Sequence, residues 1–294
     1  MSEINGIYAA SVSILDEKLN LDNSKTVKHA ENLIEQGCHG VVIFGSTGQA
    51  QLISYNQKLK LIEELSKSYL KNKFIIGTGI NALHDTINFI NFCKSYGFNK
   101  FLVMPPAYYK YGDNEVKNFF KHLIDKVGDC KIILYNFEKL CGYKFSTECV
   151  ENLVKEFPNQ IIGVKDSSYN LYKDLKISGF SVLPGSELKL LNGLKIGCSG
   201  IITATCNVTA SLSRKVYDDF KNNAPQTFND KLCNVRSVFD KFNLISALHT
   251  FISEKEACYK NILPPCNLLN NKDKQILFNE LKDLNFNANF SKVA

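Results

Sequence analysis

The sequence lacks the features of a membrane-spanning, exported or nucleic-acid-binding protein. No apolar run approaches the roughly 20 residues of a bilayer span, and the first five residues show no basic region followed by an apolar one. Arg214 and Arg236 are the only arginines, whereas base edges and phosphates are usually bound by arginine forks. We therefore expect a soluble protein that is not secreted and that binds neither membrane nor nucleic acid.

Clustered cysteines are also absent. The ten cysteines are scattered and none is spaced as C-x-x-C, so the spacing favours neither a zinc site nor a disulfide framework. Several stand in apolar segments, such as Cys93 after Phe89-Ile90-Asn91-Phe92. We expect reduced core thiols in a cytoplasmic protein without a bound metal.

What the chain does contain is an alternation of short β-branched or aromatic runs with longer amphipathic patterns. Its 294 residues suit either two domains or one large barrel of about 250 residues. The expected strands are 6–13, 40–44, 74–77, 100–104, 131–135, 161–165, 180–183 and 200–203. Because a helical pattern follows each strand, we predict an α/β fold, a (β/α)8 TIM barrel over residues 1–224. Residues 225–294 show only helical periodicity, broken at Leu263-Pro264-Pro265, and predict a small C-terminal helical extension.

Reactive side chains stand at the ends of two neighbouring strands, where barrel enzymes place their active sites. Lys165 ends the apolar run Ile161-Ile162-Gly163-Val164. Burial disfavours the charged form of an amine, and a neutral amine can attack a carbonyl carbon to form a Schiff base. Tyr135 ends the preceding strand and is able to relay protons. The alternatives are a surface lysine and a tyrosine that only packs.

Four of the remaining strands are followed by polar loops. Ser46 and Thr47 stand between two glycines, either as an anion-binding nest that suits a carboxylate or as a capped turn. Tyr108 follows Pro105-Pro106, as part of an interface patch or as a side chain that reaches a neighbouring subunit. The expected polar rim is completed by Glu187, Thr203 and Thr205.

Taken in order, these motifs resemble the dihydrodipicolinate synthase / N-acetylneuraminate lyase superfamily over almost the whole chain. The motifs are G-S-T-G at 45, P-P-x-Y-Y at 105, Y-N at 135, G-V-K-D at 163, G-S-E at 185 and G-x-x-G-I-I-T at 197. The resemblance implies a cofactor-free, pyruvate-dependent class I aldolase that forms a homo-oligomer, either a dimer or a homotetramer.

The same resemblance implies roles for individual residues. Lys165 would form the Schiff base and Tyr135 would relay protons. The carboxylate of the 2-oxo acid would be held by Ser46 and Thr47. Tyr108 would complete a hydroxyl relay across a dimer interface.

The branch of the superfamily is decided by the substrate pocket. Leu140 stands where the synthases place an arginine that binds the aldehyde's carboxylate, and Arg214 and Arg236, in the last helices, are not expected to replace it. Leu140 and the G-S-T-G loop resemble the sialic acid lyases, whereas residues 28–34 resemble the 2-keto-3-deoxygluconate aldolases. Gln49 replaces a glutamate that is common in the family.

We therefore expect a lyase that cleaves or forms a 2-keto-3-deoxy sugar acid, with pyruvate and an aldehyde as the other side of the reaction. A 4-hydroxy-tetrahydrodipicolinate (dihydrodipicolinate) synthase and a sugar-acid dehydratase of the same superfamily are alternatives. A barrel that only binds a 2-oxo acid or a protein partner is the non-catalytic alternative.

Overall fold

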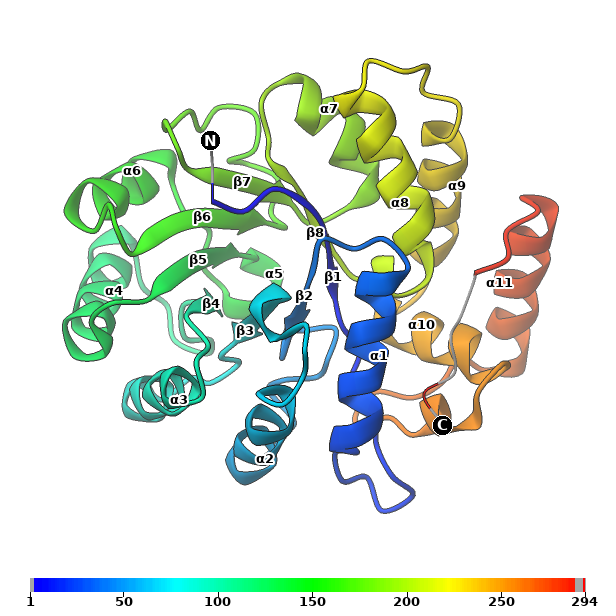
Figure 1. The fold of residues 1–294 in the computed structure, drawn as a ribbon, viewed down its shortest axis with the longest axis horizontal. Helices are drawn as coiled ribbons and strands as arrows, with labels where there is room; N and C mark the ends of the chain where they lie inside the picture. Colours follow the sequence, from blue (N-terminus) through cyan, green and yellow to red (C-terminus); the bar gives the residue numbers. More distant parts are fainter. Residues whose placement is uncertain (1–2, 289–292, 294) are drawn as a thin grey trace.

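Eight parallel strands form the centre of the molecule, and helices surround them (Figure 1). The computed structural model describes residues 3–288 and residue 293; residues 1–2, 289–292 and 294, which include part of the expected 225–294 region, lie outside the described residues. The strands are β1 (Gly6–Ala10), β2 (Gly40–Ile43), β3 (Phe74–Gly77), β4 (Lys100–Val103), β5 (Lys131–Asn136), β6 (Ile161–Asp166), β7 (Ser181–Pro184) and β8 (Gly200–Thr203). Their order in the sheet, β7-β6-β5-β4-β3-β2-β1-β8, confirms the predicted TIM barrel.

The helices follow the strands as the amphipathic patterns predict, with one exception. They are α1 (Asn23–Glu35), α2 (Tyr55–Leu65), α3 (Leu83–Ser95), α4 (Asp113–Val127), α5 (Glu138–Cys141), α6 (Thr147–Glu156), α7 (Leu190–Lys195), α8 (Cys206–Lys221), α9 (Asn229–Phe239), α10 (Leu244–Ser253) and α11 (Asn271–Asp283). Short 3-10 turns are η1 (Lys71–Lys73), η2 (Glu187–Lys189) and η3 (Ala257–Lys260). The expected helix between β6 and β7 is not formed in the described chain. The Asp166 carboxylate instead accepts hydrogen bonds from three backbone amides of the loop that follows it.

The barrel is closed where the first and last strands meet. β8 pairs with β1, and β7 and β8, the two ends of the sheet order, are joined by Ser199 N, just before β8, which donates to Val182 O of β7 at 2.9 Å. Gly200 has a φ of +152°, and a Cβ atom there would lie 1.8 Å from Gly6 O. Only glycine allows the two strands to approach so closely.

The first strand is shorter than expected and ends at Ala10, not at Ser13. Beyond it, Val12 N donates to the side-chain oxygen of Asn207 at 3.0 Å. Asn207 Nδ2 in turn donates to Ala10 O at 2.8 Å and to Ala204 O at 2.6 Å. This one amide therefore holds together the loops after β1 and β8.

The C-terminal helices pack against one end of the barrel rather than standing apart from it. In Figure 1 they form the yellow-to-red group beside α8 and α1. Their buried side chains share one apolar cluster with Val12, Ile14 and Ala204 of the barrel loops and with Val208 of α8. α9, α10 and η3 thereby reach the end of the barrel at which the strands finish.

Three elements are joined by a buried histidine. His29 Nε2 of α1 lies 2.8 Å from Asn207 Oδ1, and its Nδ1 lies 2.8 Å from the Tyr259 hydroxyl of η3. Burial lowers the pKa of His29 from 6.5 to about 4. Burial also lowers the pKa of His249, which is within 2.8 Å of Tyr259 O.

Seven of the ten cysteines are buried, and all ten are free thiols. Burial raises the pKa of the Cys130 and Cys198 thiols to about 11, which keeps them protonated near neutral pH.

A cytoplasmic location stays a prediction. Among the residues that the structure describes, no helix combines the length and the apolarity needed to cross a bilayer.

We predict that the fold loses stability on acidification between pH 6.5 and pH 4. The unfolded chain protonates His29 near pH 6.5, whereas the folded chain protonates it only near pH 4. His29 alone should therefore lower the free energy of unfolding by on the order of 3 kcal/mol across this window, and His249 acts in the same direction. Urea unfolding followed by circular dichroism at several pH values measures it. His29→Gln should flatten the dependence, and the exposed control His122→Gln should keep it; an unchanged slope in His29→Gln would contradict the assignment.

Candidate active site

The pairing of β5 with β6 brings Tyr135 and Lys165 together. The two residues are register partners, and Lys165 Nζ lies 4.1 Å from the centroid of the Tyr135 ring. Lys165 is 3% exposed and Tyr135 is 4% exposed. The two strand ends thus place an amine and a phenol side by side, inside the barrel mouth.

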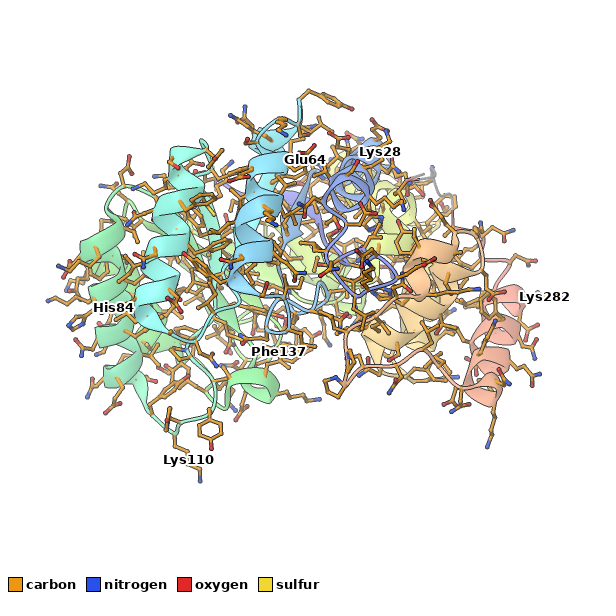
Figure 2. The ribbon with its side chains drawn as sticks, turned by 90° about the horizontal axis from the view of Figure 1, so that it is seen from below. Lys28, Glu64, His84, Lys110, Phe137 and Lys282 are labelled. Atoms are coloured by element: carbon orange, nitrogen blue, oxygen red, sulfur yellow. The ribbon has the colours of Figure 1, made fainter. Side chains whose placement is uncertain are left out.

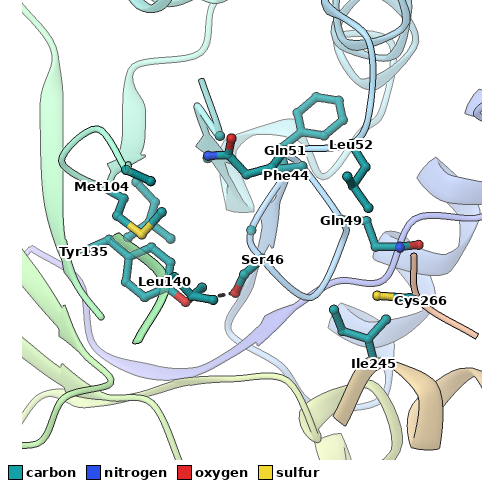
Figure 3. A pocket seen from close by; sticks show the side chains of 16 residues that line it. Phe44, Ser46, Gln49, Gln51, Leu52, Met104, Tyr135, Leu140, Ile245 and Cys266 are labelled. Atoms are coloured by element: carbon teal, nitrogen blue, oxygen red, sulfur yellow. Dashed lines mark hydrogen bonds between the residues drawn. The ribbon is translucent and has the colours of Figure 1, made fainter. Parts of the chain in front are cut away.

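The loop after β2 adds a hydroxyl to this pair. Ser46 Oγ lies 3.0 Å from the Tyr135 hydroxyl, the contact marked by a dashed line in Figure 3. The loop is a tight turn in which Gly48 N donates to Gly45 O at 3.1 Å. Ser13 Oγ, from the loop after β1, donates to Gly48 O at 2.7 Å and holds the turn in place. A rigid loop of this kind can present hydroxyls and amides to a carboxylate.

A polar cavity of about 730 Å³ contains the amine. We call it the lysine cavity. The predicted residues Lys165, Tyr135, Ser46 and Thr47 all border it. Its remaining polar wall consists of Glu138, Lys139, Ser167, Ser168, Tyr169, Ser186, Lys189, Arg236 and Asp240. Four basic side chains face two acidic ones, which suits an anionic ligand.

A second cavity of about 300 Å³ meets the first at Ser46 and Tyr135. We call it the apolar cavity (Figure 3). Its wall is mainly Phe44, Ala50, Leu52, Leu102, Met104, Ala107, Leu140, Ile245 and Cys266. Leu140, expected in the aldehyde's pocket, therefore borders the apolar cavity and not the lysine cavity.

Arg236 is the residue that the sequence reasoning missed. Neither arginine was expected to replace the arginine of the synthases, but α9 packs over the barrel mouth and Arg236, unlike Arg214, borders the lysine cavity. The side chain is 7% exposed. Nothing local in the sequence marks it apart from Asp240 one helical turn later, whose Oδ1 accepts from Arg236 Nε at 2.9 Å.

Glu187, Thr203 and Thr205 lie elsewhere than expected. They were predicted to contact substrate, but they are at most 1% exposed and border neither cavity. Arg236 Nη1 donates to Glu187 Oε2 at 3.0 Å, to Thr203 Oγ1 at 2.8 Å and to Thr205 Oγ1 at 3.2 Å. Thr209 Oγ1 donates to the other carboxylate oxygen at 3.1 Å. These three predicted residues surround Arg236 and hold it in place.

Tyr108 lies outside both cavities of the single chain. It is 90% exposed and has a φ of +91°, on the loop after β4. Figure 2 shows Lys110, two residues further on, at the end of a loop that extends from the barrel. Ala107 N donates to Asn81 Oδ1 at 3.0 Å, which anchors the base of this loop.

The site has the parts for imine chemistry and none for binding a metal by three side chains. Among residues 3–288 and 293, no group of three His, Cys, Asp or Glu side chains could hold a metal ion. A buried amine, a phenol in contact with it and a turn that carries the Ser46 hydroxyl can together hold a 2-oxo acid with its keto carbon at the amine.

The comparisons with known proteins agree on one family. Residues 3–284 match the model of the Dihydrodipicolinate synthetase family. A 4-hydroxy-tetrahydrodipicolinate synthase of Legionella pneumophila is 30% identical over 222 residues, which cover 72% of this chain and 75% of that protein. A putative mitochondrial 4-hydroxy-2-oxoglutarate aldolase of Coccidioides immitis is 26% identical over 74% of this chain and 72% of its own length.

A solved structure agrees in fold. It is that of a prophage protein of Escherichia coli K12 that belongs to the dihydrodipicolinic acid synthase family, in complex with pyruvate. It superposes with a TM-score of 0.86 over 97% of this chain and 99% of its own, at 21% identity. At this identity the likeness establishes the barrel fold alone.

We predict that Glu187→Ala destabilises the protein by about 3–5 kcal/mol, because it leaves the buried Arg236 guanidinium without its inner carboxylate. Urea unfolding measures the loss. Glu254→Ala, which removes an exposed partner of Lys274, is the matched control and should cost less than about 1 kcal/mol. The double variant Glu187→Leu/Arg236→Met should recover most of the loss. Equal losses in the free energy of unfolding of Glu187→Ala and of the control would show that the buried Arg236–Glu187 pair does not stabilise the wall of the lysine cavity.

Proposed function

This chain belongs to the dihydrodipicolinate synthetase family and is a lyase, and we propose that it acts through an imine between Lys165 and a 2-oxo acid. The proposed reaction cleaves or forms a 2-keto-3-deoxy sugar acid, with pyruvate and an aldehyde as the other side. The observation that carries the proposal is the contact of Lys165 Nζ with the Tyr135 ring at 4.1 Å, together with the Ser46 hydroxyl 3.0 Å from the phenol.

The steps follow from these three groups. Lys165 Nζ adds to the C2 keto carbon, and loss of water gives an iminium. Tyr135 removes the proton of the C4 hydroxyl, with Ser46 as the next hydroxyl along the relay. The C3–C4 bond then breaks, its electron pair moves toward the iminium nitrogen, and an enamine and an aldehyde are formed. Protonation of the enamine at C3 and hydrolysis release pyruvate and restore the amine.

The carboxylate of the 2-oxo acid goes to the loop after β2. Ser46 and Thr47 border the lysine cavity beside Tyr135, and Thr47 is 5% exposed. Hydroxyls held in a rigid turn lose little freedom when they bind an anion. With the carboxylate bound there, the keto carbon would lie at Lys165 and the remainder of the substrate would extend into the lysine cavity.

We also propose a homo-oligomer, a dimer or a tetramer, in which Tyr108 of one subunit approaches the site of another. Large apolar side chains are exposed around the mouth of the apolar cavity, where Leu52 is 43% and Leu140 is 44% exposed. Ala107, next to Tyr108, borders the same cavity. A tyrosine entering there from a second copy would cover this surface and reach the Ser46–Tyr135 contact.

Arg236 is the observation in favour of a second candidate function, that of a synthase. A synthase that condenses pyruvate with aspartate semialdehyde needs a cation for the aldehyde's carboxylate, and Arg236 borders the lysine cavity. Its Nη1 and Nε, however, are already engaged by Glu187 and Asp240, two carboxylates against one guanidinium. We therefore favour the neutral, polyhydroxy aldehyde.

We predict that pyruvate and borohydride will attach a reduced pyruvyl group to Lys165. Peptide mapping by mass spectrometry locates the label. The matched control within the same chain is Lys58, which is 2% exposed and whose pKa burial lowers to about 8, but which does not border the lysine cavity. Label on Lys58 or on another lysine, with Lys165 unmodified, would overturn the mechanism.

We predict that glyceraldehyde condenses with enzyme-bound pyruvate at least about tenfold more efficiently, in kcat/KM, than aspartate semialdehyde. An arginine free to bind the aldehyde's carboxylate with two hydrogen bonds would raise kcat/KM for aspartate semialdehyde by about tenfold or more, and Arg236 is not free to do so. A coupled assay at saturating pyruvate compares the two aldehydes. Preference for aspartate semialdehyde, lost in Arg236→Met/Glu187→Leu, would establish the synthase instead. The double variant is used so that no buried charge is left unpaired.

A further inference from the structure

Gln49 ties the C-terminal part of the chain to the loop that carries Ser46 and Thr47. It is 5% exposed, and its backbone N donates to Ser46 O at 3.0 Å. Its side chain makes two hydrogen bonds to one residue. Nε2 donates to Leu263 O at 2.9 Å, and Oε1 accepts from Leu263 N at 3.1 Å. The pair joins positions that are 214 residues apart.

The segment held by Gln49 closes one side of the apolar cavity. Cys266, three residues after Leu263, borders this cavity together with Gln49, Ser46 and Tyr135. Figure 3 shows Gln49, Ile245 and Cys266 on the side of the cavity away from Tyr135. A second bond, from Asn261 Nδ2 to Leu15 O at 2.9 Å, fastens the same segment to the loop after β1.

Only a group with both a donor and an acceptor can make this pair of bonds. The primary amide of Gln49 supplies one of each, and they match the N–H and C=O of Leu263. A carboxylate at this position has acceptors only, and one of its oxygens would face Leu263 O. A protonated carboxylic acid, in contrast, again supplies one donor and one acceptor.

We propose that Gln49 is a positioning residue for the carboxylate end of the 2-oxo acid. By pairing with the Leu263 peptide it fixes the turn that presents Ser46 and Thr47, so that its loss weakens the binding of pyruvate and leaves imine formation at Lys165 intact. This inference rests on the proposed function, in which Ser46 and Thr47 receive the carboxylate.

The test is Gln49→Glu, assayed with pyruvate and cyanoborohydride at pH 8 and pH 6. Two quantities are measured by mass spectrometry: the pyruvate concentration that half-saturates labelling of Lys165, and the labelling rate at saturation. At pH 8 the half-saturating concentration should rise about tenfold relative to wild type, because the loss of the bonds to Leu263 releases the turn that presents Ser46 and Thr47, with little change in the rate at saturation.

At pH 6 the concentration should return toward the wild-type value. Desolvation and the facing Leu263 carbonyl favour the neutral acid of the introduced glutamate, which regains the missing donor. The other titratable side chains bordering the apolar cavity are Tyr135 and Cys266. Both are present in the wild type, so the comparison with wild type at each pH removes their contribution.

Two further variants make the result specific. Gln49→Met keeps the length of the side chain without hydrogen bonds, and should weaken pyruvate binding equally at both pH values. Gln51→Glu introduces the same charge at an exposed position of the same cavity and should leave binding unchanged at both. Circular dichroism melting curves at each pH identify the folded variants, and Gln49→Met at pH 8 decides the outcome if Gln49→Glu does not fold there.

The outcomes separate this inference from the proposed function. Wild-type protein without label on Lys165 is a failure of the proposed function. Normal labelling of the wild type, with unchanged half-saturation in Gln49→Glu at pH 8, overturns the role of Gln49. The role of Gln49 is also overturned if the half-saturating concentration of Gln49→Glu is raised at pH 8 and stays raised at pH 6. The paired donor and acceptor would then not be the cause of the weaker pyruvate binding.

Discussion

The parallel register between β5 and β6 is the constraint on which the whole site depends. Because side chains alternate along a strand, the pair Tyr135 and Lys165 faces the barrel mouth, whereas the next pair, Asn136 and Asp166, faces the opposite way. The outward pair is joined by Asn136 Nδ2, which donates to Asp166 Oδ1 at 2.8 Å. Asp166 also collects three backbone amides of the loop after β6. The register that aligns the amine with the phenol thus also shapes a wall of the lysine cavity.

The barrel supplies Lys165, Tyr135 and Ser46, and the C-terminal helices supply part of the walls of the two cavities around them. α9 contributes Arg236 to the lysine cavity, and the segment after η3 contributes Cys266 to the apolar cavity. Arg236 is held by Glu187, and the segment that carries Cys266 is held at Leu263 by Gln49. A region that looks like an appendage in the sequence is therefore part of the site.

The sequence predicted what depends on local pattern. The strands follow from short β-branched runs, and Lys165, Tyr135 and Ser46 could be placed together because parallel strand ends meet at one rim. The sequence could not predict which side chains at this rim bind one another. Arg236 was not expected in the site and Glu187 was expected to bind substrate, but the two side chains bind each other. Their contact spans 49 positions, and a contact at that separation leaves no periodic pattern in the sequence. The prediction of a helix after β6 was wrong for a similar reason. The Asp166 side chain accepts hydrogen bonds from backbone amides of the segment that was expected to be helical.

The buried pair of Arg236 and Glu187 also constrains how this enzyme can diverge. A neutral residue at either position alone leaves the other charge buried, and the threonines that complete the guanidinium's hydrogen bonds would lose their partner as well. The wall of the lysine cavity can therefore be remodelled only by replacements that arrive together. Among related enzymes, these two positions should covary, and a change of substrate that requires a different wall has to cross an unstable intermediate or acquire stability elsewhere first.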